Sequence, residues 1–157
     1  MNASKTAKRE PAPKKPVVHT LAESQARLRE SGLKSTASRL AVLRHMETVD
    51  APSSHAEVAV ALLSKGFDRA TLYRNLIDLT HVGILSKSDF GDHVFRFELR
   101  GAHAGHGAEH PHFVCTDCGT VSCLPEVRVK ITAPPNTPNV AGNDVAVQLK
   151  GRCEQCT

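Results

Sequence analysis

The sequence predicts an α+β protein in which helices occupy the first half of the chain and short strands follow. Leucines recur at intervals of three and four residues before residue 80, as they do on the buried faces of helices. Apolar and polar residues then alternate over 94–99, which is typical of a strand. Two Cys-x-x-Cys pairs in the second half supply ligands for one metal ion. We therefore expect a helical N-terminal part and a smaller, metal-stabilised C-terminal part.

Length and composition limit the classes of protein. A chain of 157 residues can form one ordinary domain or two small ones, and a unit below about 80 residues often needs a metal ion or a partner to be stable. Five cysteines, no secretory signal and no apolar run near ~18 residues indicate a cytoplasmic protein with no membrane partner. In that reducing setting, paired cysteines are more often metal ligands than disulfides.

Residues 1–19 are predicted to form a disordered basic tail. Residues 1–16 contain five basic residues and one acid, a balance of +4 that equals the net charge of the whole chain. Pro11, Pro13 and Pro16 oppose a helix there. Two roles stay open for the tail: it keeps the protein soluble, or it is attracted to the phosphate backbone of a nucleic acid.

Two helices are predicted after the tail. Thr20 and Glu23 form a capping-box pattern that begins the first helix, and Leu21 and Leu28 lie on one face of it. The second helix begins near residue 36 and ends before residue 51, with buried positions at Leu40, Leu43 and Met46.

A third helix is predicted from Ser54, which forms a second capping box with Glu57. The same stretch contains His55-Ala-Glu, the first half of a zinc-deaminase signature whose second half is Pro-Cys-x-x-Cys. Val114, not proline, precedes Cys115. We therefore favour the helix start over the deaminase site and expect His55 to be an exposed residue of the first turn.

A fourth helix is predicted from its N-cap, Asp68, with a buried stripe of Leu72, Leu76 and Leu79. Polar side chains cluster in its first turns, and the N-terminal turns of a recognition helix reach base edges and phosphates in the major groove of DNA. The candidate DNA-binding residues are Arg69, Thr71, Tyr73 and Arg74. The alternative is an ordinary amphipathic helix with a solvated polar face.

Two strands are predicted next, over 84–87 and 94–99, with Gly91 and Asp92 in the turn between them. Three helices followed by a hairpin make a winged helix-turn-helix. In that DNA-binding fold the last helix enters the major groove and the hairpin touches the flanking backbone. The hairpin therefore favours DNA binding over the amphipathic-helix alternative.

The second half of the chain holds two kinds of metal ligand. The thiolates of 115–118 and 153–156 can close one tetrahedral zinc site, which we interpret as structural. His110 and His112 lie just upstream, and alternate residues of an extended segment point to the same side. Because imidazole is a reversible metal ligand, this pair is the candidate sensing site.

Together these motifs resemble the ferric uptake regulator (Fur) family from about residue 21 to residue 156. The matching segments are 28–43, 70–79, 83–85, 97–99, the His-x-His before Cys-x-x-Cys-Gly, and the terminal Gly-x-Cys-x-x-Cys. The resemblance implies a metal-dependent transcriptional repressor that binds a double-stranded DNA operator as a homodimer and takes no small-molecule substrate.

The resemblance also implies a domain organisation. Residues 20–100 would form the winged-helix DNA-binding domain, 101–109 a Gly/His-rich hinge linker with His103 and His106, and 110–157 a small α/β dimerisation domain that binds metal. Family members usually have a helix near 125–143. Four prolines and an alternating pattern over 127–131 predict a strand in that region of this chain instead.

Residue by residue, the resemblance implies two metal sites and a DNA contact. The residues that match the family's structural Zn²⁺ ligands are Cys115, Cys118, Cys153 and Cys156. Those that match its regulatory ligands, near the hinge between the domains, are Glu98, His110 and His112. Those that match its DNA-contacting pair are Tyr73 and Arg74.

Departures from the family pattern bear on the regulatory site. Pro52 stands where relatives often have a further histidine ligand, so His55 is a candidate substitute. Cys123 stands where relatives often have an Asp or Glu ligand, and His93 in the hairpin is another candidate. A mixed imidazole, carboxylate and thiolate set favours Zn²⁺ over a hard ion such as Mn²⁺, and we expect regulatory Zn²⁺ or Fe²⁺. The alternatives are a buried free cysteine at 123 and a solvated turn histidine at 93.

Three functions compete. The expected one is a repressor of metal-uptake or stress genes, in which a bound ion ties Glu98 to the strand of His110 and His112 and so sets the separation of two recognition helices. A peroxide sensor of the same family would need redox-active iron and oxidisable histidines, and Cys123 as a ligand argues against it. A zinc-dependent hydrolytic enzyme would need an open zinc position, which four thiolates do not leave, so we expect no enzyme.

Overall fold

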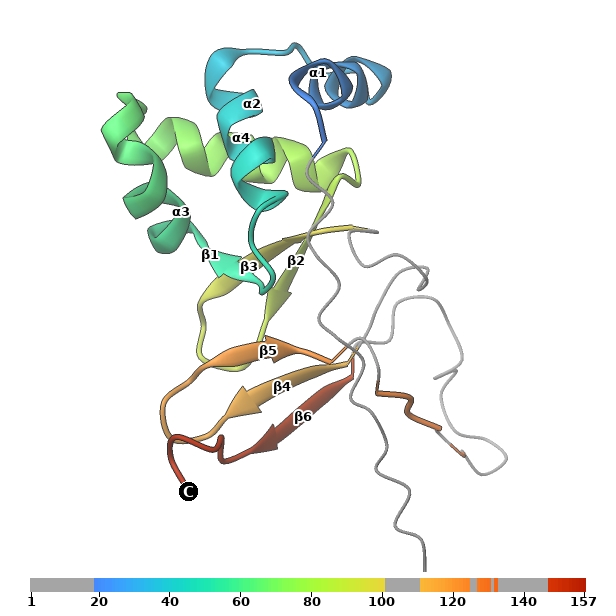
Figure 1. Ribbon diagram of the computed structural model, residues 1–157, viewed down its shortest axis with the longest axis vertical. Helices are drawn as coiled ribbons and strands as arrows, with labels where there is room; N and C mark the ends of the chain where they lie inside the picture. Colours follow the sequence, from blue (N-terminus) through green and yellow to red (C-terminus); the bar gives the residue numbers. More distant parts are fainter. Residues whose placement is uncertain (1–18, 101–110, 125–126, 131, 133–146) are drawn as a thin grey trace, which may run out of the picture.

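The computed structural model describes residues 19–100, 111–124, 127–130, 132 and 147–157. The helices gather at one end of the molecule, and two three-stranded sheets follow beneath them (Figure 1). This arrangement confirms the predicted α+β fold class. The predicted basic tail and hinge linker lie almost wholly outside the described residues. No helix of the described part is long and apolar enough to cross a bilayer.

Each of the four α-helices begins at a polar N-cap whose side chain accepts a hydrogen bond from the backbone three residues on. The N-caps are Thr20, Thr36, Ser54 and Asp68. Thr20 and Ser54 form complete capping boxes, as the sequence predicts. The helices are α1 (Leu21–Glu30), α2 (Ala37–Met46), α3 (His55–Leu62), the short 3-10 helix η1 (Leu63–Lys65) and α4 (Arg69–His81).

The core lies between the helices and the first sheet. The predicted stripe of α4 is fully buried at Leu72, Leu76 and Leu79. On α1, Leu28 is buried, whereas Leu21, seven residues earlier on the same face, is 52% exposed. The other buried residues of this core are Val42, Leu43, Met46, Val58, Ala59, Leu62, Ile84, Leu85, Phe97 and Leu99.

The first sheet is antiparallel, in the order β1-β3-β2. Its strands are β1 (Ser53–Ser54), β2 (Leu85–Asp89) and β3 (Phe95–Leu99). Phe97 and Leu99 point into the core, so Glu98 between them points to the opposite face. The hairpin is the predicted one, with strand starts displaced by one residue toward the C-terminus.

The second sheet has the order β5-β4-β6. Its strands are β4 (His112–Cys115), β5 (Val121–Cys123) and β6 (Gln148–Gly151). β4 pairs antiparallel with β5, with His112 opposite Cys123, and parallel with β6, with Cys115 beside Gly151. The second sheet thus joins segments from both ends of the C-terminal region.

The strand predicted over 127–131 is wrong for the residues the structure describes there. Residues 127–130 belong to no strand, and both Val127 and Val129 are exposed. The Val127 amide donates to the carbonyl oxygen of Leu124, which closes a turn instead of a ladder. An alternating pattern predicts a strand only where a partner strand is within reach, and none pairs with these residues in the described part.

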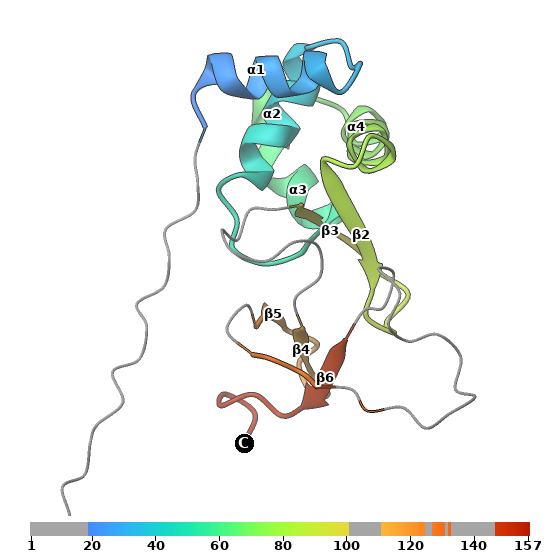
Figure 2. The same ribbon diagram turned by 90° about the vertical axis from the view of Figure 1, so that its right-hand side faces the viewer.

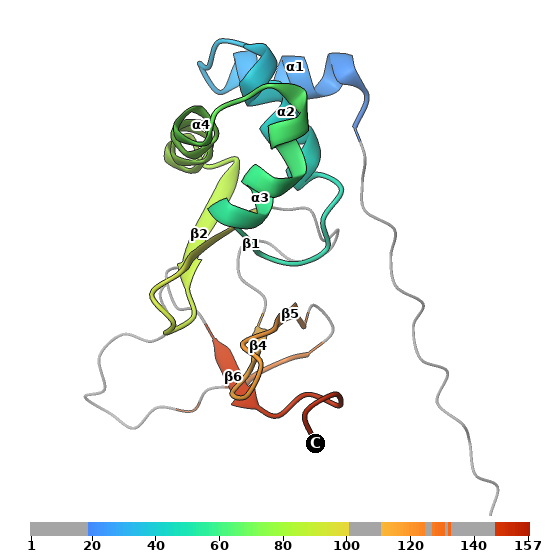
Figure 3. The same cartoon turned by 90° about the vertical axis from the view of Figure 1, so that its left-hand side faces the viewer.

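The loop between β2 and β3 points at the second sheet, as the two side views show (Figures 2 and 3). Phe90 in this loop is 3% exposed, and its ring meets the ring of His112 edge-on with centroids 5.2 Å apart. The Gln148 side chain donates to the carbonyl oxygen of Asp89 at 3.0 Å. Phe90, at the start of the hairpin loop, is therefore buried against the C-terminal sheet, whereas residues 91–94 of the loop are exposed.

Candidate metal centres

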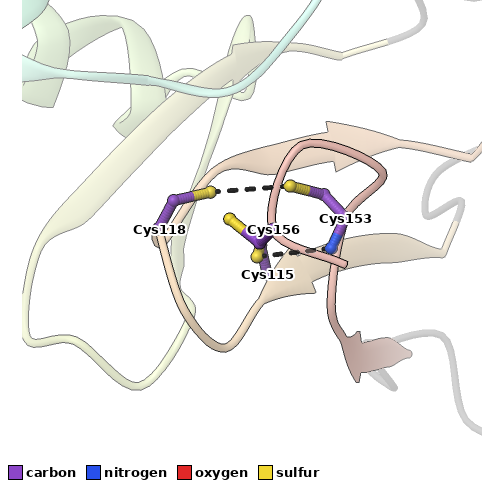
Figure 4. Close-up of side chains that lie close together, drawn as sticks. All are labelled: Cys115, Cys118, Cys153 and Cys156. Atoms are coloured by element: carbon purple, nitrogen blue, oxygen red, sulfur yellow. Dashed lines mark hydrogen bonds between the residues drawn. The ribbon is translucent and has the colours of Figure 1, made fainter.

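Two tight turns bring the four cysteines of the Cys-x-x-Cys pairs together (Figure 4). Cys115 ends β4, and Cys153 follows β6 by two residues, so the parallel pairing of these strands places the turns side by side. The Gly119 amide donates to the Cys115 carbonyl oxygen at 3.0 Å, and the Cys156 amide donates to that of Cys153 at 2.9 Å. Each turn thereby aims both of its sulfurs at one point. We call these residues the four-cysteine group.

The spacing of the sulfurs suits a tetrahedral metal site. All four Sγ atoms lie within 4.8 Å of one another, and those of Cys118 and Cys153 are 3.8 Å apart. A zinc–sulfur bond of about 2.3 Å in a regular tetrahedron puts neighbouring sulfurs about 3.8 Å apart. A disulfide would need about 2.05 Å, and all four cysteines are free. The residues present therefore fit a bound zinc ion.

The electrostatics of the four-cysteine group also suit a cation. The backbone amides of Cys118 and Cys153 point at the Cys115 sulfur and lower the pKa of that thiol to about 6. Hydrogen bonds from Thr120 lower the pKa of Cys118. The pKa of Cys156 is raised to about 12, first by the Cys153 thiol and then by its other sulfur neighbours. Crowded sulfurs resist a second negative charge until a metal ion compensates for it.

A second group, which we call the three-donor group, consists of Glu98, His112 and Cys123. His112 and Cys123 are directly opposite each other in the β4–β5 pair, so their side chains share a face. Glu98 comes from β3 in the other sheet. His112 Nε2 lies 3.2 Å and Cys123 Sγ 3.8 Å from Glu98 Oε2. Three strands from both sheets therefore converge on one point.

The surroundings of the three-donor group shield it from water. His112 is 7% exposed and lies against the Phe90 ring. The Ser86 hydroxyl donates to Glu98 Oε1 at 3.3 Å, which orients the carboxylate. Burial, followed by the nearby charge of Glu98, raises the pKa of Cys123 to about 12. An ion bound there would replace the thiol proton of Cys123.

The structure places the remaining candidate ligands elsewhere. His55 contacts Arg69 and Tyr73 of α4 and joins neither metal group. It is half-buried, so the expectation that it is exposed is wrong, because α4 packs against it. The deaminase pairing of His55 with Cys115 is therefore not formed. His93 is exposed in the hairpin loop and also joins neither group. His110, with His103 and His106, lies outside the described residues.

The candidate DNA-binding residues lie in the first turns of α4. Arg69, Tyr73 and Arg74 are exposed, and Tyr73 keeps 41% of its surface accessible. Thr71 differs, because its hydroxyl donates to Asp68 Oδ2 at 2.6 Å and its amide to Oδ1 at 2.9 Å. Thr71 therefore serves the N-cap of the helix. The other three form an exposed polar surface suited to contact with DNA.

Sequence reasoning did not find Ser86, Phe90 or Gln148, which support the three-donor group or the hairpin beside it. Each acts through a contact between elements distant in the chain, and no spacing rule marks such contacts. The register of the hairpin could have indicated Ser86, because it is directly opposite Glu98.

A winged helix above a sheet with clustered metal ligands defines a class of protein, the metal-responsive transcription regulators. The model of the ferric uptake regulator family matches residues 30–134, which is more than half of the chain. The chain belongs to the ferric uptake regulator family.

Individual relatives agree with the family assignment. The chain is 37% identical over 100 residues to the ferric uptake regulation protein of Bordetella parapertussis, covering 62% of this chain and 68% of the relative. It is 32% identical over 108 residues to the peroxide-responsive repressor PerR of Staphylococcus aureus, covering 67% of this chain and 68% of that protein. The structure resembles the Vibrio cholerae ferric uptake regulator with a TM-score of 0.61 and 25% identity, over 82% of this chain and 98% of that one.

Proposed function

We propose that the protein is a zinc-dependent repressor that binds a double-stranded DNA operator as a homodimer, with the regulatory ion held by the three-donor group. The position of Cys123 carries this proposal. Its sulfur faces Glu98 and lies opposite His112 in the sheet, so the group offers a thiolate, a carboxylate and an imidazole.

The donor set favours zinc over the other candidate ions. Thiolate is a soft ligand that suits zinc, whereas manganese favours oxygen donors. Iron in the ferrous state is the second candidate, because imidazole and carboxylate also suit it. His110 remains a candidate fourth ligand on the sequence pattern alone.

The proposed response follows from which elements carry the three donors. Glu98 lies on the winged helix, whereas His112 and Cys123 lie on the C-terminal sheet. Shared ligation of one ion would hold these two parts in one relative position. In a homodimer that position sets the distance between the two α4 helices, which must match the helical repeat of DNA. Arg69, Tyr73 and Arg74 would then contact DNA in each half-site.

The four-cysteine group is proposed as a permanent zinc site with no regulatory role. Four thiolates complete the tetrahedral shell of zinc, so no position remains for an exchanging ligand. The small sheet β5-β4-β6 buries few apolar residues, since of its members only His112 and Cys115 are buried. Such a sheet needs the crosslink that a metal ion supplies.

The test compares the ion requirement of the wild-type protein with that of Cys123→Ser. DNA binding would be measured by fluorescence anisotropy over defined free concentrations of Zn²⁺, Fe²⁺ and Mn²⁺, with a duplex selected by the wild-type protein from a random pool. We expect Zn²⁺ to support binding at the lowest free concentration. Cys123→Ser should raise the required Zn²⁺ at least about tenfold, since even the loss of a residue that only supports a ligand costs this much.

Ser122→Ala is the matched control, because Ser122 adjoins Cys123 but is exposed. Equal zinc requirements for wild type and Cys123→Ser would show that Cys123 is not a ligand of the regulatory ion. Preference for Fe²⁺ together with loss of DNA binding after peroxide treatment would instead favour a peroxide-responsive repressor, as the Staphylococcus aureus relative is named.

A further inference from the structure

The N-terminus of α3 contacts the first turn of α4 through one side chain. His55 Nε2 lies 2.9 Å from the carbonyl oxygen of Arg69. The His55 ring also meets the Tyr73 ring edge-on, with centroids 5.2 Å apart and an interplanar angle of 66°. His55 thus touches two of the three exposed residues proposed to contact DNA.

His55 is itself held firmly. It is the first residue of α3 and follows the N-cap Ser54. The Ser54 amide and hydroxyl each donate to the Glu57 carboxylate at 2.7 Å, and the Glu57 amide donates back to the Ser54 hydroxyl. Ser54 also pairs with Arg96 of β3 in the first sheet. The backbone beneath the imidazole is therefore fixed by a capping box and a sheet.

The hydrogen bond defines the state of the imidazole. A carbonyl oxygen only accepts, so Nε2 must carry the proton that is donated to Arg69. Both the neutral Nε2–H tautomer and the charged imidazolium have that proton. The imidazole is therefore a donor to the backbone of α4 in this contact.

We infer that His55 is a positioning residue for DNA recognition: it orients Tyr73 and the first turn of α4 before DNA binds. The inference rests on the proposed DNA-binding role of α4. An exposed tyrosine has several rotamers in solution, and ordering it on binding costs conformational entropy. The edge contact with the His55 ring restricts the Tyr73 ring in advance, while the hydrogen bond to Arg69 holds the backbone of the same turn.

The experiment is a double-mutant cycle on the full-length, zinc-loaded protein. Operator affinity would be measured for wild type, His55→Ala, Tyr73→Ala and the double variant, using the duplex that the wild-type protein selects from a random pool. His55→Ala should weaken binding roughly three- to tenfold, the effect of one hydrogen bond and one aromatic contact. In the Tyr73→Ala background, the same substitution should cost less than about twofold, because most of its effect acts through Tyr73.

An equal loss from His55→Ala in both backgrounds would overturn the inference, since His55 would then act independently of Tyr73. If the alanine variant does not fold, His55→Leu serves in its place: it fills the space but removes both the aromatic ring and the donor, and its loss should likewise shrink in the Tyr73→Ala background. His81→Ala is the matched control, an exposed histidine at the opposite end of α4.

Failure of the proposed function would look different. If Tyr73→Ala and Arg69→Ala both leave operator affinity unchanged, α4 is not the DNA-contacting helix and the proposed function fails with the inference. If those two variants weaken binding but His55→Ala does not, only the inference on His55 fails.

Discussion

Gln148 of β6 donates a hydrogen bond to the backbone carbonyl oxygen of Asp89 at 3.0 Å. This bond connects the C-terminal sheet to the end of β2 in the winged-helix hairpin, beside the contact between Phe90 and His112. His112 and Gln148 are neighbours in the parallel β4–β6 pair. The residue proposed to sense metal therefore adjoins the residue that holds the hairpin.

Removing this bond should weaken the response to metal more than it weakens the fold. Gln148→Ala is expected to lower the zinc-dependent gain in operator affinity by about 1 kcal/mol, the usual contribution of a single hydrogen bond. The measurement is the ratio of DNA affinities with and without zinc. Gln155→Ala, an exposed glutamine outside this contact, is the control. An unchanged ratio in Gln148→Ala would show that the hairpin contact does not transmit the signal.

Cys115→Ser should lose zinc and the C-terminal sheet together. Cys115 ends β4 and is the one buried member of the four-cysteine group. Because structural zinc sites supply about 10 kcal/mol or more of folding free energy, we expect a large fall in the melting temperature, on the order of 10 °C or more. Zinc content and thermal unfolding would be measured on the same preparation. A variant that retained its dimer and its melting temperature would refute the structural role.

His110→Ala combined with His112→Ala should abolish zinc-dependent DNA binding while leaving a folded dimer. His112 is a member of the three-donor group and not of the four-cysteine group. The zinc ion proposed for the four-cysteine group should therefore remain bound. Zinc stoichiometry, light scattering and operator binding test these expectations together. His93→Ala, in the exposed hairpin loop, should respond to zinc as the wild type does. Unfolding of the double variant would make the histidine pair structural.

A buried carboxyl group predicts a pH dependence of stability in the helical part. Glu47 is 3% exposed and accepts from the Ser24 hydroxyl at 3.1 Å. Burial raises its pKa above the ordinary 4.5, although Ser24 and the nearby positive charges of Arg27 and Arg44 oppose the shift. The folded protein therefore binds this proton more tightly than the unfolded chain. Its contribution to stability is present below pH 4.5 and is lost as pH rises through the raised pKa.

Two variants test the direction of this pH dependence of stability. Glu47→Gln should be more stable than wild type near pH 8, with the difference shrinking toward about pH 5, as followed by urea unfolding. Ser24→Ala should destabilise by about 1–3 kcal/mol near neutral pH, because it removes a donor from a buried carboxylate. A Glu47→Gln variant that is less stable than wild type near pH 8 would mean that the carboxylate is stabilised by its cationic neighbours.

The features that the sequence predicts well are those decided within a few residues of chain. The capping residues Thr20, Ser54 and Asp68 and the leucine stripe of α4 depend on local spacing, and all were confirmed. The convergence of the four cysteines was also predictable, since each Cys-x-x-Cys turn is local and one zinc ion needs both.

Features that depend on contacts between distant elements were not predictable. The burial of His55 requires α4 to lie over the start of α3, and its sequence pattern indicated only a helix start. The sequence also did not indicate that Phe90 of the hairpin packs against His112 from a different sheet. Residues 127–130 alternate as a strand does but have no partner there. In each case the outcome depended on whether a distant element packs against the segment, which the local pattern does not specify.

β4 carries His112 at its start and Cys115 at its end, about 10 Å apart along the strand. This closeness has a practical consequence for preparing the metal-free regulator. We expect that a chelator strong enough to remove zinc from the four-cysteine group would also unfold the strand that presents His112. On the proposed assignment, a chelator with an affinity between those of the two groups would empty the three-donor group and leave the C-terminal sheet folded.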